Sequence, residues 1–240
     1  MKALVFAAGF GERMRPLTEH TPKPLLDVGG RPLIVRHLEK LAQAGATDVV
    51  VNTSWLATRF PAELGDGSRW GLRLHFSVEG AVPLETGGGM FNAMPWLRGD
   101  GDGNDAFMAV NGDIFSDHDY ASLPLEPPGD AHLVLVDNPE HHRGGDFMLG
   151  NDGRIAATGE PRLTFAGIGV YRPSLFDTWR DAVAGAPGID ETPPRFQLAP
   201  LLRAAMARGA VTGEHHRGRW TDVGTPERLA RLDAELRAEA

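Results

Sequence analysis

Residues 3–26 of this chain read ALVFAAGFGERMRPLTEHTPKPLL, and our prediction of the fold starts from this stretch. Its first six residues form an apolar run with the length and bulk of a buried strand. The run ends in Gly-Phe-Gly at residues 9–11, and Arg13, Arg15 and Lys23 follow. A glycine loop after a buried strand exposes backbone N–H groups that bind phosphate oxygens, and nearby cations add charge and further donors. The stretch therefore predicts a strand that leads directly into a nucleotide phosphate site.

Two well-known phosphate-binding loops do not fit these residues. A dinucleotide fingerprint requires a third glycine at the position of Met14, and a Walker loop requires Gly-Lys-Ser or Gly-Lys-Thr, which does not occur near this stretch. A plain strand–helix turn would also explain the Gly-x-Gly by itself. The basic residues favour the phosphate site, as does the position of Lys23, because Pro22 and Pro24 restrict the backbone around a lysine that must point at a ligand.

Composition limits the classes of protein to consider. The chain has 240 residues, 42% of them hydrophobic, so we expect one α/β domain spanning residues 1–240 with a substantial core. The net charge of −8 argues against binding to nucleic acid or to anionic membranes, but not against nucleotides, because local cations can outweigh it. There is no cysteine for a disulfide or a thiolate metal site, and no apolar run reaches the roughly 18 residues of a membrane span. The first strand follows Met1 at once, so we expect no signal peptide and a cytoplasmic protein.

The order of apolar segments predicts the fold class. In the first half, strands alternate with helices, which is typical of a mostly parallel sheet with helices on both faces. In the second half, strand-like segments follow one another with few helices, so we expect an added antiparallel layer. The expected strands cover residues 3–8, 48–52, 72–76, 106–110, 131–137, 146–149, 155–158, 165–171, 211–215 and 219–223. The expected helices cover 31–44, 55–64, 86–97, 174–183, 197–208 and 226 to the C-terminus, and the expected loops cover 100–104 and, as a mobile loop, 185–195.

Two carboxylates lie in positions suited to a metal ion. Asp113 follows the buried strand 106–110, at the sheet edge where the loop after the first strand also lies. Asp222 lies in Trp-Thr-Asp-Val-Gly-Thr at residues 220–225. Carboxylate oxygens beside phosphate oxygens and waters are the ligands that Mg²⁺ prefers. We therefore expect Asp113 and Asp222 to hold Mg²⁺, although either aspartate alone could be an ordinary turn residue.

The motifs taken together resemble a known family. AAGFGERMRPLT and TPKPLL are similar to the signature of the sugar-1-phosphate nucleotidyltransferases, and GERMRPLT followed by HTPKPLL most resembles the N-acetylmuramate-1-phosphate uridylyltransferases of bacterial cell-wall recycling. The resemblance implies the nucleotide-diphospho-sugar transferase fold, with a nucleotide-binding half at about residues 1–115 and a sugar-binding half at about 116–240. It also implies that Asn-Gly-Asp and Trp-x-Asp-x-Gly-Thr are the metal-ligand motifs. Larger relatives often carry a C-terminal hexapeptide-repeat domain, which we expect this chain to lack.

The activity implied by the resemblance joins UTP and N-acetylmuramate 1-phosphate into UDP-N-acetylmuramate and pyrophosphate, with Mg²⁺. Arg13 and Lys23 would be the catalytic cations, Arg13 at the β- and γ-phosphates and Lys23 at the α-phosphate. Glu79 would accept a hydrogen bond from uracil N3–H, and a triple glycine would let the base lie against the backbone. The nucleotide-binding residues would be Ala8, Gly9, Gly11, Glu12, Arg13, Lys23, Glu79, Gly87 and Gly88, and the sugar-binding residues would be Asn111, Asp146, Glu160 and Gly167.

Several alternatives remain open at this stage. Glu79 could also bind guanine, so the same chemistry with GTP and mannose 1-phosphate, or with dTTP or UTP and glucose 1-phosphate, remains possible, as does a non-catalytic nucleotide-sugar sensor. Many members of the family have a lysine in Glu-Lys-Pro where this chain has Gly-Glu-Pro at 159–161, so the cation for the sugar phosphate is unidentified. Arg143, Arg162 and Arg219 could each bind the lactyl carboxylate of N-acetylmuramate. We expect either a monomer or a homodimer.

Overall fold

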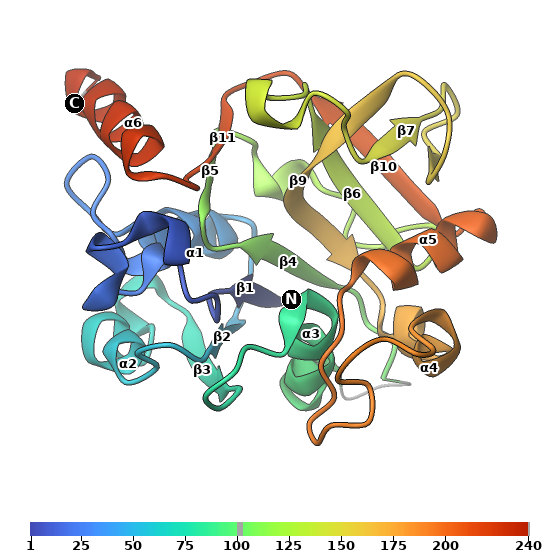
Figure 1. Ribbon diagram of the computed structural model, residues 1–240, viewed down its shortest axis with the longest axis horizontal. Helices are drawn as coiled ribbons and strands as arrows, with labels where there is room; N and C mark the ends of the chain where they lie inside the picture. Colours follow the sequence, from blue (N-terminus) through green and yellow to red (C-terminus); the bar gives the residue numbers. More distant parts are fainter. Residues whose placement is uncertain (100–102, 240) are drawn as a thin grey trace.

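A central sheet runs through the whole protein in the computed structural model, which describes residues 1–99 and 103–239 (Figure 1). Its strand order is β10-β6-β9-β4-β1-β2-β3. Four strands of the first half are parallel neighbours, and they are β1 (Lys2–Phe6), β2 (Asp48–Thr53), β3 (Arg73–Val78) and β4 (Phe107–Asn111). The register aligns the last residue of β1, Phe6, with Asn52 of β2 and Asn111 of β4. The loops that follow these strands therefore meet at one edge of the sheet.

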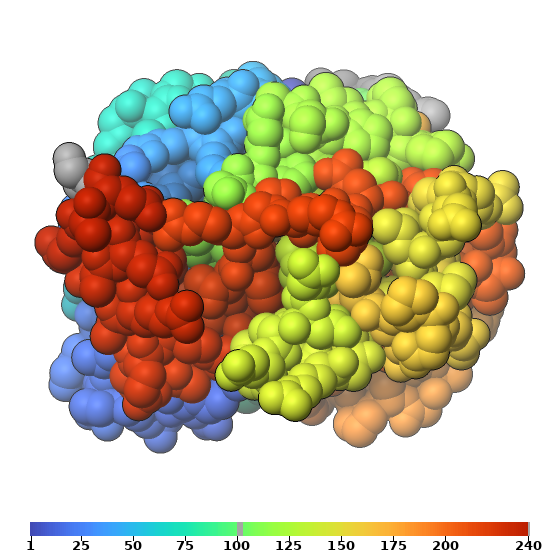
Figure 2. Space-filling view, turned by 90° about the horizontal axis from the view of Figure 1, so that it is seen from above, coloured from blue at the N-terminus to red at the C-terminus, as the bar shows by residue number. Residues whose placement is uncertain are grey.

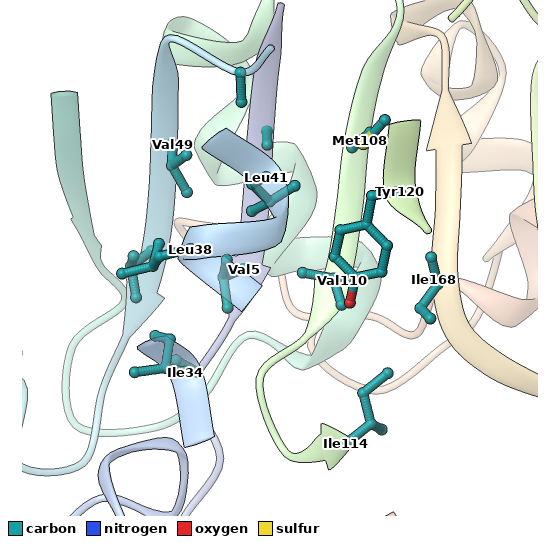
Figure 3. Close-up of a cluster of buried hydrophobic side chains, with 14 of the residues drawn as sticks. Val5, Ile34, Leu38, Leu41, Val49, Met108, Val110, Ile114, Tyr120 and Ile168 are labelled. Atoms are coloured by element: carbon teal, nitrogen blue, oxygen red, sulfur yellow. The ribbon is translucent and has the colours of Figure 1, made fainter. Parts of the chain in front are cut away.

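Helices cover both faces of the sheet because neighbouring residues of each buried strand point to opposite sides. Val5 of β1 packs with α1 (Leu33–Gln43) and α2 (Arg59–Leu64) in the core cluster drawn in Figure 3. Leu4 faces the other way and packs with α3 (Glu85–Leu97) and α5 (Ala199–Ala207). The expected fold class, a mostly parallel sheet with helices on both faces, is confirmed.

The antiparallel strands of the second half extend the same sheet. The ten-residue strand β9 (Arg162–Tyr171) is antiparallel to β4 on one side and to β6 (Ala131–Val136) on the other. At its opposite end, β9 pairs with β7 (Phe147–Leu149), which pairs in turn with β8 (Ile155–Ala156). The edge strand β10 (Val211–His216) runs parallel to β6, which the expectation of an antiparallel addition had not included.

The C-terminal segment returns to the N-terminal half of the chain. Strand β11 (Trp220–Asp222) pairs antiparallel with β5 (Ile114–Ser116), a short strand that the sequence patterns did not predict. Helix α6 (Pro226–Ala238) then packs Leu232 into a small core with Met14 and Leu26. Figure 2 shows this helix, in dark red, beside the blue N-terminal residues. The two expected halves are therefore interlocked through α6.

Two further expectations differ from the structure, and a third falls partly outside the described residues. The helix expected over 55–64 begins only at Arg59, because Leu56 adopts a left-handed φ of 52°. The helix expected over 174–183 is a 3₁₀ turn, Pro173–Phe176, followed by the short α4 (Trp179–Ala182). Residues 100–102 of the expected loop 100–104 lie outside the described residues. Within the described ranges, no helix is both long enough and apolar enough to span a membrane.

Candidate active site

A cavity of about 750 Å³ opens at the sheet edge where β1, β2 and β4 end. The loop after β1 forms one wall, and residues from α3, from the segment before α5 and from the segment after β11 complete the lining. Of the residues predicted from sequence, the cavity brings together Ala8, Gly9, Gly11, Glu12, Arg13, Lys23, Glu79, Asn111 and Asp113. Gly87, Gly88, Asp146, Glu160, Gly167 and Asp222 do not line it.

The loop after β1 is held in a shape that requires glycine at one position. Gly11 has a φ of 65°, and a Cβ there would lie 2.8 Å from Cγ2 of Thr18. Thr18 also donates a hydrogen bond from Oγ1 to the Gly11 carbonyl oxygen at 2.8 Å. Arg13, in the short 3₁₀ turn that follows, is exposed, and its guanidinium makes no hydrogen bond or ion pair within the described residues. Arg13 is therefore available to a ligand in the cavity.

Lys23 and Asp113 form an ion pair inside the cavity. Nζ of Lys23 lies 2.6 Å from Oδ2 of Asp113, and the lysine residue is only 8% exposed whereas the aspartate side chain is 39% exposed. The turn before Asp113 approaches β1 closely, because the Gly112 N–H donates to the Phe6 carbonyl oxygen at 2.8 Å. A Cβ at Gly112 would lie 2.7 Å from the same oxygen, so glycine is needed for this approach. The structure thus brings the predicted lysine and one predicted metal ligand into direct contact.

A buried histidine fixes the backbone directly after Asp113. His37 of α1 contacts the Ile114 carbonyl oxygen through Nε2 at 2.9 Å and the Tyr120 hydroxyl through Nδ1 at 2.8 Å. Because a carbonyl oxygen only accepts hydrogen bonds, Nε2 donates, and a neutral imidazole then accepts from Tyr120 at Nδ1. Burial lowers the pKa of His37 from 6.5 to about 4, so the neutral form is the stable one near pH 7. His37 therefore acts as a positioning residue for the strand that follows Asp113.

Asp222 is placed beside Asp113 through backbone pairing. It pairs with Ile114 in the β5–β11 ladder, and the next N–H, of Val223, donates to the Asp113 carbonyl oxygen at 2.8 Å. Its side chain is 24% exposed and accepts a hydrogen bond from Nη1 of Arg228 at 2.6 Å. Asp222 does not itself line the cavity, but Gly224, two residues later, does. Both aspartates are thus at the same edge of the site, each beside one cation.

Glu79 connects three segments at the far end of the cavity. Its Oε1 accepts from Nδ2 of Asn52 at 2.6 Å, and its Oε2 accepts from the Leu84 N–H at 2.7 Å. Asn52 in turn accepts from the Ala7 N–H at 2.7 Å, which links the carboxylate to the end of β1. Burial raises the pKa of the Glu79 carboxyl group, although these two hydrogen bonds oppose the shift. Each carboxylate oxygen keeps a lone pair for a ligand, so contact with the base stays a prediction.

Two of the three glycines at 87–89 pack closely against a segment far away in the sequence. A Cβ at Gly87 would lie 2.6 Å from the Phe196 ring, and a Cβ at Gly88 would lie 2.5 Å from the Pro194 carbonyl oxygen. The Gly88 N–H also donates to the Phe196 carbonyl oxygen at 2.9 Å. Both glycines are buried and absent from the cavity lining, so a role in making room for the base stays a prediction. What the structure shows is that they allow residues 194–197 to pack tightly against α3.

The predicted sugar-binding residues divide into two groups. Asn111 lines the cavity, and Gly167 packs against it, since a Cβ at Gly167 would lie 2.5 Å from Nδ2 of Asn111. Asp146 is engaged elsewhere, because its Oδ2 accepts from the Phe165 N–H at 2.8 Å and its Oδ1 lies 3.0 Å from Nε2 of His142. Glu160 is exposed. Only Asn111 therefore faces the cavity directly.

The predicted site left out several cavity residues, among them Asn52, Glu85 and Arg195. Asn52 could have been found, because it nearly ends β2 at the same edge as the loop after β1. Glu85 has a φ of 63°, which is rare for a residue other than glycine and has no signal in the sequence. Arg195 reaches the cavity from a segment that we expected to be a mobile loop, and it is ion-paired with Glu191 at 2.9 Å.

Comparison with known proteins agrees with this geometry. Residues 2–125 match the family described as nucleotidyl transferase. The chain is 45% identical to the N-acetylmuramate alpha-1-phosphate uridylyltransferase of Neisseria meningitidis serogroup B, over 98% of this chain and 97% of that protein. This chain is also 33% identical to the mannose-1-phosphate guanylyltransferase of Mycobacterium tuberculosis. The match covers 98% of this chain but only 64% of the mycobacterial protein.

The fold also matches a solved structure. A crystal structure assigned as a glucose-1-phosphate thymidylyltransferase from Bacillus anthracis superposes with a TM-score of 0.80, covering 99% of this chain and 95% of that one at 24% identity. At this identity the likeness concerns the fold alone. The family match and the nearly full-length identity to the Neisseria protein go further, and they confirm what the motifs in residues 3–26 predicted: this chain belongs to the nucleotidyl transferase family and is a sugar-1-phosphate nucleotidyltransferase.

Proposed function

We propose that this protein joins UTP and N-acetylmuramate α-1-phosphate to give UDP-N-acetylmuramate and pyrophosphate, and that it serves peptidoglycan recycling in the cell wall. The observation that carries the proposal is the position of Lys23 and Asp113 in the cavity wall, directly behind the loop after β1. The choice of substrates is supported by the 45% identity to the Neisseria uridylyltransferase over nearly the full length of both proteins.

The reaction requires no general base from the protein. An oxygen of the acceptor phosphate forms a bond to the α-phosphorus of UTP, the bond from that phosphorus to the bridging β-phosphate oxygen breaks, and pyrophosphate leaves with the electron pair. A phosphate monoester has a second pKa near 6 and is mostly dianionic at pH 7. Catalysis then depends on alignment and on positive charge around the phosphates. Lys23 contacts the α-phosphate, and Arg13, which has no partner among the described residues, holds the β- and γ-phosphates.

Asp113 and Asp222 are the residues that would hold Mg²⁺. Both carboxylates are partly exposed, and backbone pairing through β5 and β11 places them at the same edge. Within residues 1–99 and 103–239, no cluster of three or more His, Cys, Asp or Glu side chains could hold a metal ion alone. This donor set fits Mg²⁺, which uses one or two carboxylates together with phosphate oxygens and water. When bound, the ion would supply positive charge against the triphosphate.

A second candidate function is the same transfer with GTP and mannose 1-phosphate. It is favoured by the 33% identity to the mycobacterial guanylyltransferase and by Glu79, whose carboxylate can accept from two guanine donors as well as from uracil N3–H. The Neisseria relative is more similar and matches this chain from end to end, which favours the uridylyltransferase.

The experiment that separates these functions measures pyrophosphate release with Mg²⁺. UTP, GTP, dTTP, CTP and ATP are each combined with the 1-phosphates of N-acetylmuramate, N-acetylglucosamine, glucose and mannose. We expect turnover with UTP and N-acetylmuramate 1-phosphate only. Turnover with GTP and mannose 1-phosphate would select the second function. Two results together would indicate a nucleotide-sugar sensor. The folded protein would release no pyrophosphate with any pair, and an Asp113→Asn variant would bind nucleotide sugar as well as the wild type does.

A further inference from the structure

Two of the three arginines that the sequence offered near the acceptor, Arg162 and Arg219, are engaged by other groups. Gly-Glu-Pro at 159–161 contains no basic residue. Arg219 is occupied by Glu239 at 2.6 Å and Glu235 at 3.3 Å. Arg162 donates from Nη2 to the carbonyl oxygens of Asp146 and Ala157. A dianionic phosphate entering beside two carboxylates needs positive charge close to them, so we searched this side of the cavity for another cation.

Arg228 meets this requirement by its position on α6. It lies in the first turn of the helix, where its N–H is capped by the Thr225 hydroxyl. Nη1 donates to Oδ1 of Asp222 at 2.6 Å and lies 2.8 Å from Nε2 of His141. In Figure 2 the yellow-green segment near residue 140 lies beside the red C-terminal segment, in agreement with this contact. Nε2 of His141 also lies 3.0 Å from the same Oδ1, so Arg228 and His141 lie side by side at one oxygen of Asp222.

The other donors of Arg228 lie next to Gly224 of the cavity lining, although Arg228 itself does not line the cavity. Among the described residues, Nε and Nη2 have no hydrogen-bond partner, although the side chain is only 22% exposed. Nη2 is the atom nearest to where a Cβ of Gly224 would stand, and Gly224 lines the cavity. Any larger residue at 224 would displace the guanidinium from this wall. The free Nε–Nη2 edge is the paired-donor edge with which arginine binds phosphate oxygens.

We propose that Arg228, with His141 beside it, binds the phosphate group of the acceptor sugar 1-phosphate. The inference rests on the proposed function and adds a binding residue to it. Arg228 is paired with Asp222, just as Lys23 is paired with Asp113. The two ion pairs thus place one cation for the nucleotide phosphates and one for the acceptor at the two carboxylates. Arg195 also lines the cavity, but its guanidinium is paired with Glu191 at 2.9 Å.

The test compares Arg228→Gln and Arg228→Lys with the wild type, using whichever substrate pair the wild type turns over. Loss of charge-assisted hydrogen bonds to phosphate should raise the KM for the sugar 1-phosphate by about tenfold or more in Arg228→Gln. Arg228→Lys keeps the charge but loses the paired donors, so its KM for the sugar 1-phosphate should lie between those of the wild type and Arg228→Gln. The KM for the nucleotide and the Mg²⁺ concentration for half-maximal rate should stay within about twofold. Calorimetric titration of the sugar 1-phosphate, with a non-hydrolysable nucleotide analogue present, should show the same loss of affinity.

Arg231→Gln is the matched control, because Arg231 lies on the same helix, is 82% exposed at its side chain and pairs only with Glu235. It should leave all these constants unchanged. Thermal unfolding of every variant separates a local effect from a misfolded protein. The proposal would be overturned if Arg228→Gln left the KM for the sugar 1-phosphate unchanged, or if it raised the Mg²⁺ concentration for half-maximal rate instead of that KM. Arg228 would then be a residue that only positions Asp222. A loss of binding for N-acetylmuramate 1-phosphate but not for N-acetylglucosamine 1-phosphate would also overturn it, by assigning Arg228 to the lactyl carboxylate. An inactive wild type would refute the proposed function instead.

Discussion

Gly88→Ala tests whether Gly88 serves the packing of residues 194–197 on α3, as the structure indicates. The added methyl group would lie 2.5 Å from the Pro194 carbonyl oxygen and 3.3 Å from Cα of Arg195, both of which are backbone atoms that cannot rotate away. The Gly88 N–H bond to the Phe196 carbonyl oxygen, at 2.9 Å, holds the same segment in place. The substitution must therefore push residues 194–197 away from α3, or be accommodated by strain in the helix.

The expected magnitude combines two opposing effects. Overpacking of a tight contact costs about 1–3 kcal/mol of unfolding free energy. Replacing glycine by alanine within a helix returns up to about 1 kcal/mol through helix propensity. The net loss should be about 1–2 kcal/mol, which lowers Tm by about 2–8 °C for a chain of this length. Thermal unfolding followed by circular dichroism, without nucleotide, measures it directly.

Gly144→Ala provides the control for this experiment. No atom lies within 4 Å of where its Cβ would stand, and its φ is outside the left-handed region. Its Tm should equal or slightly exceed that of the wild type, because alanine reduces the entropy of the unfolded chain. If Gly88→Ala unfolded at the same temperature as the wild type or above it, the packing of residues 194–197 on α3 would be refuted.

Three further predictions concern the phosphate end of the site. Lys23→Met should lower kcat on the order of 100-fold by removing charge at the α-phosphate, while Tm changes little because Asp113 keeps contact with water. Arg13→Gln should raise the KM for UTP with no change in Tm, since the side chain is exposed and has no partner among the described residues. His37 titrates at 6.5 when unfolded and at about 4 when folded, so the unfolded state takes up the proton first and stability falls as pH drops through this window. His37→Gln should remove up to about 1.4 kcal/mol per pH unit of that slope, and urea unfolding between pH 7 and pH 4 measures it.

The features encoded by local patterns could be predicted from the sequence. The buried strand at 3–8 and its glycine loop were evident because an apolar run ending in Gly-x-Gly is a local signal, and the same holds for Asp113 after β4. Strand β5 was missed because three residues are too few to show a period, and it is held by pairing with β11, about 100 residues away. The parallel pairing of β10 with β6 depends likewise on long-range contacts.

In the candidate site, too, residues with a local sequence signal could be predicted, and residues whose role depends on the folded structure could not. Lys23 and Asp113 were chosen from motifs, and the structure places them 2.6 Å apart. The role of Gly88 could not be read from the sequence, because its partner, the Pro194 carbonyl oxygen, is a backbone atom about a hundred residues later. Arg228 was missed for a different reason: it is only six residues from Asp222, but its contact depends on how the turn after β11 leads into α6, which has no signal in the sequence.

The most direct test of the account is the product of the reaction itself. Purified protein is incubated with UTP, N-acetylmuramate α-1-phosphate and Mg²⁺, and the nucleotide sugar and pyrophosphate are quantified together by mass spectrometry and a pyrophosphate assay. The account predicts UDP-N-acetylmuramate and pyrophosphate in equal amounts, with neither formed when the sugar phosphate is left out. Formation of UMP or UDP without nucleotide sugar, or no product from folded protein, would contradict it.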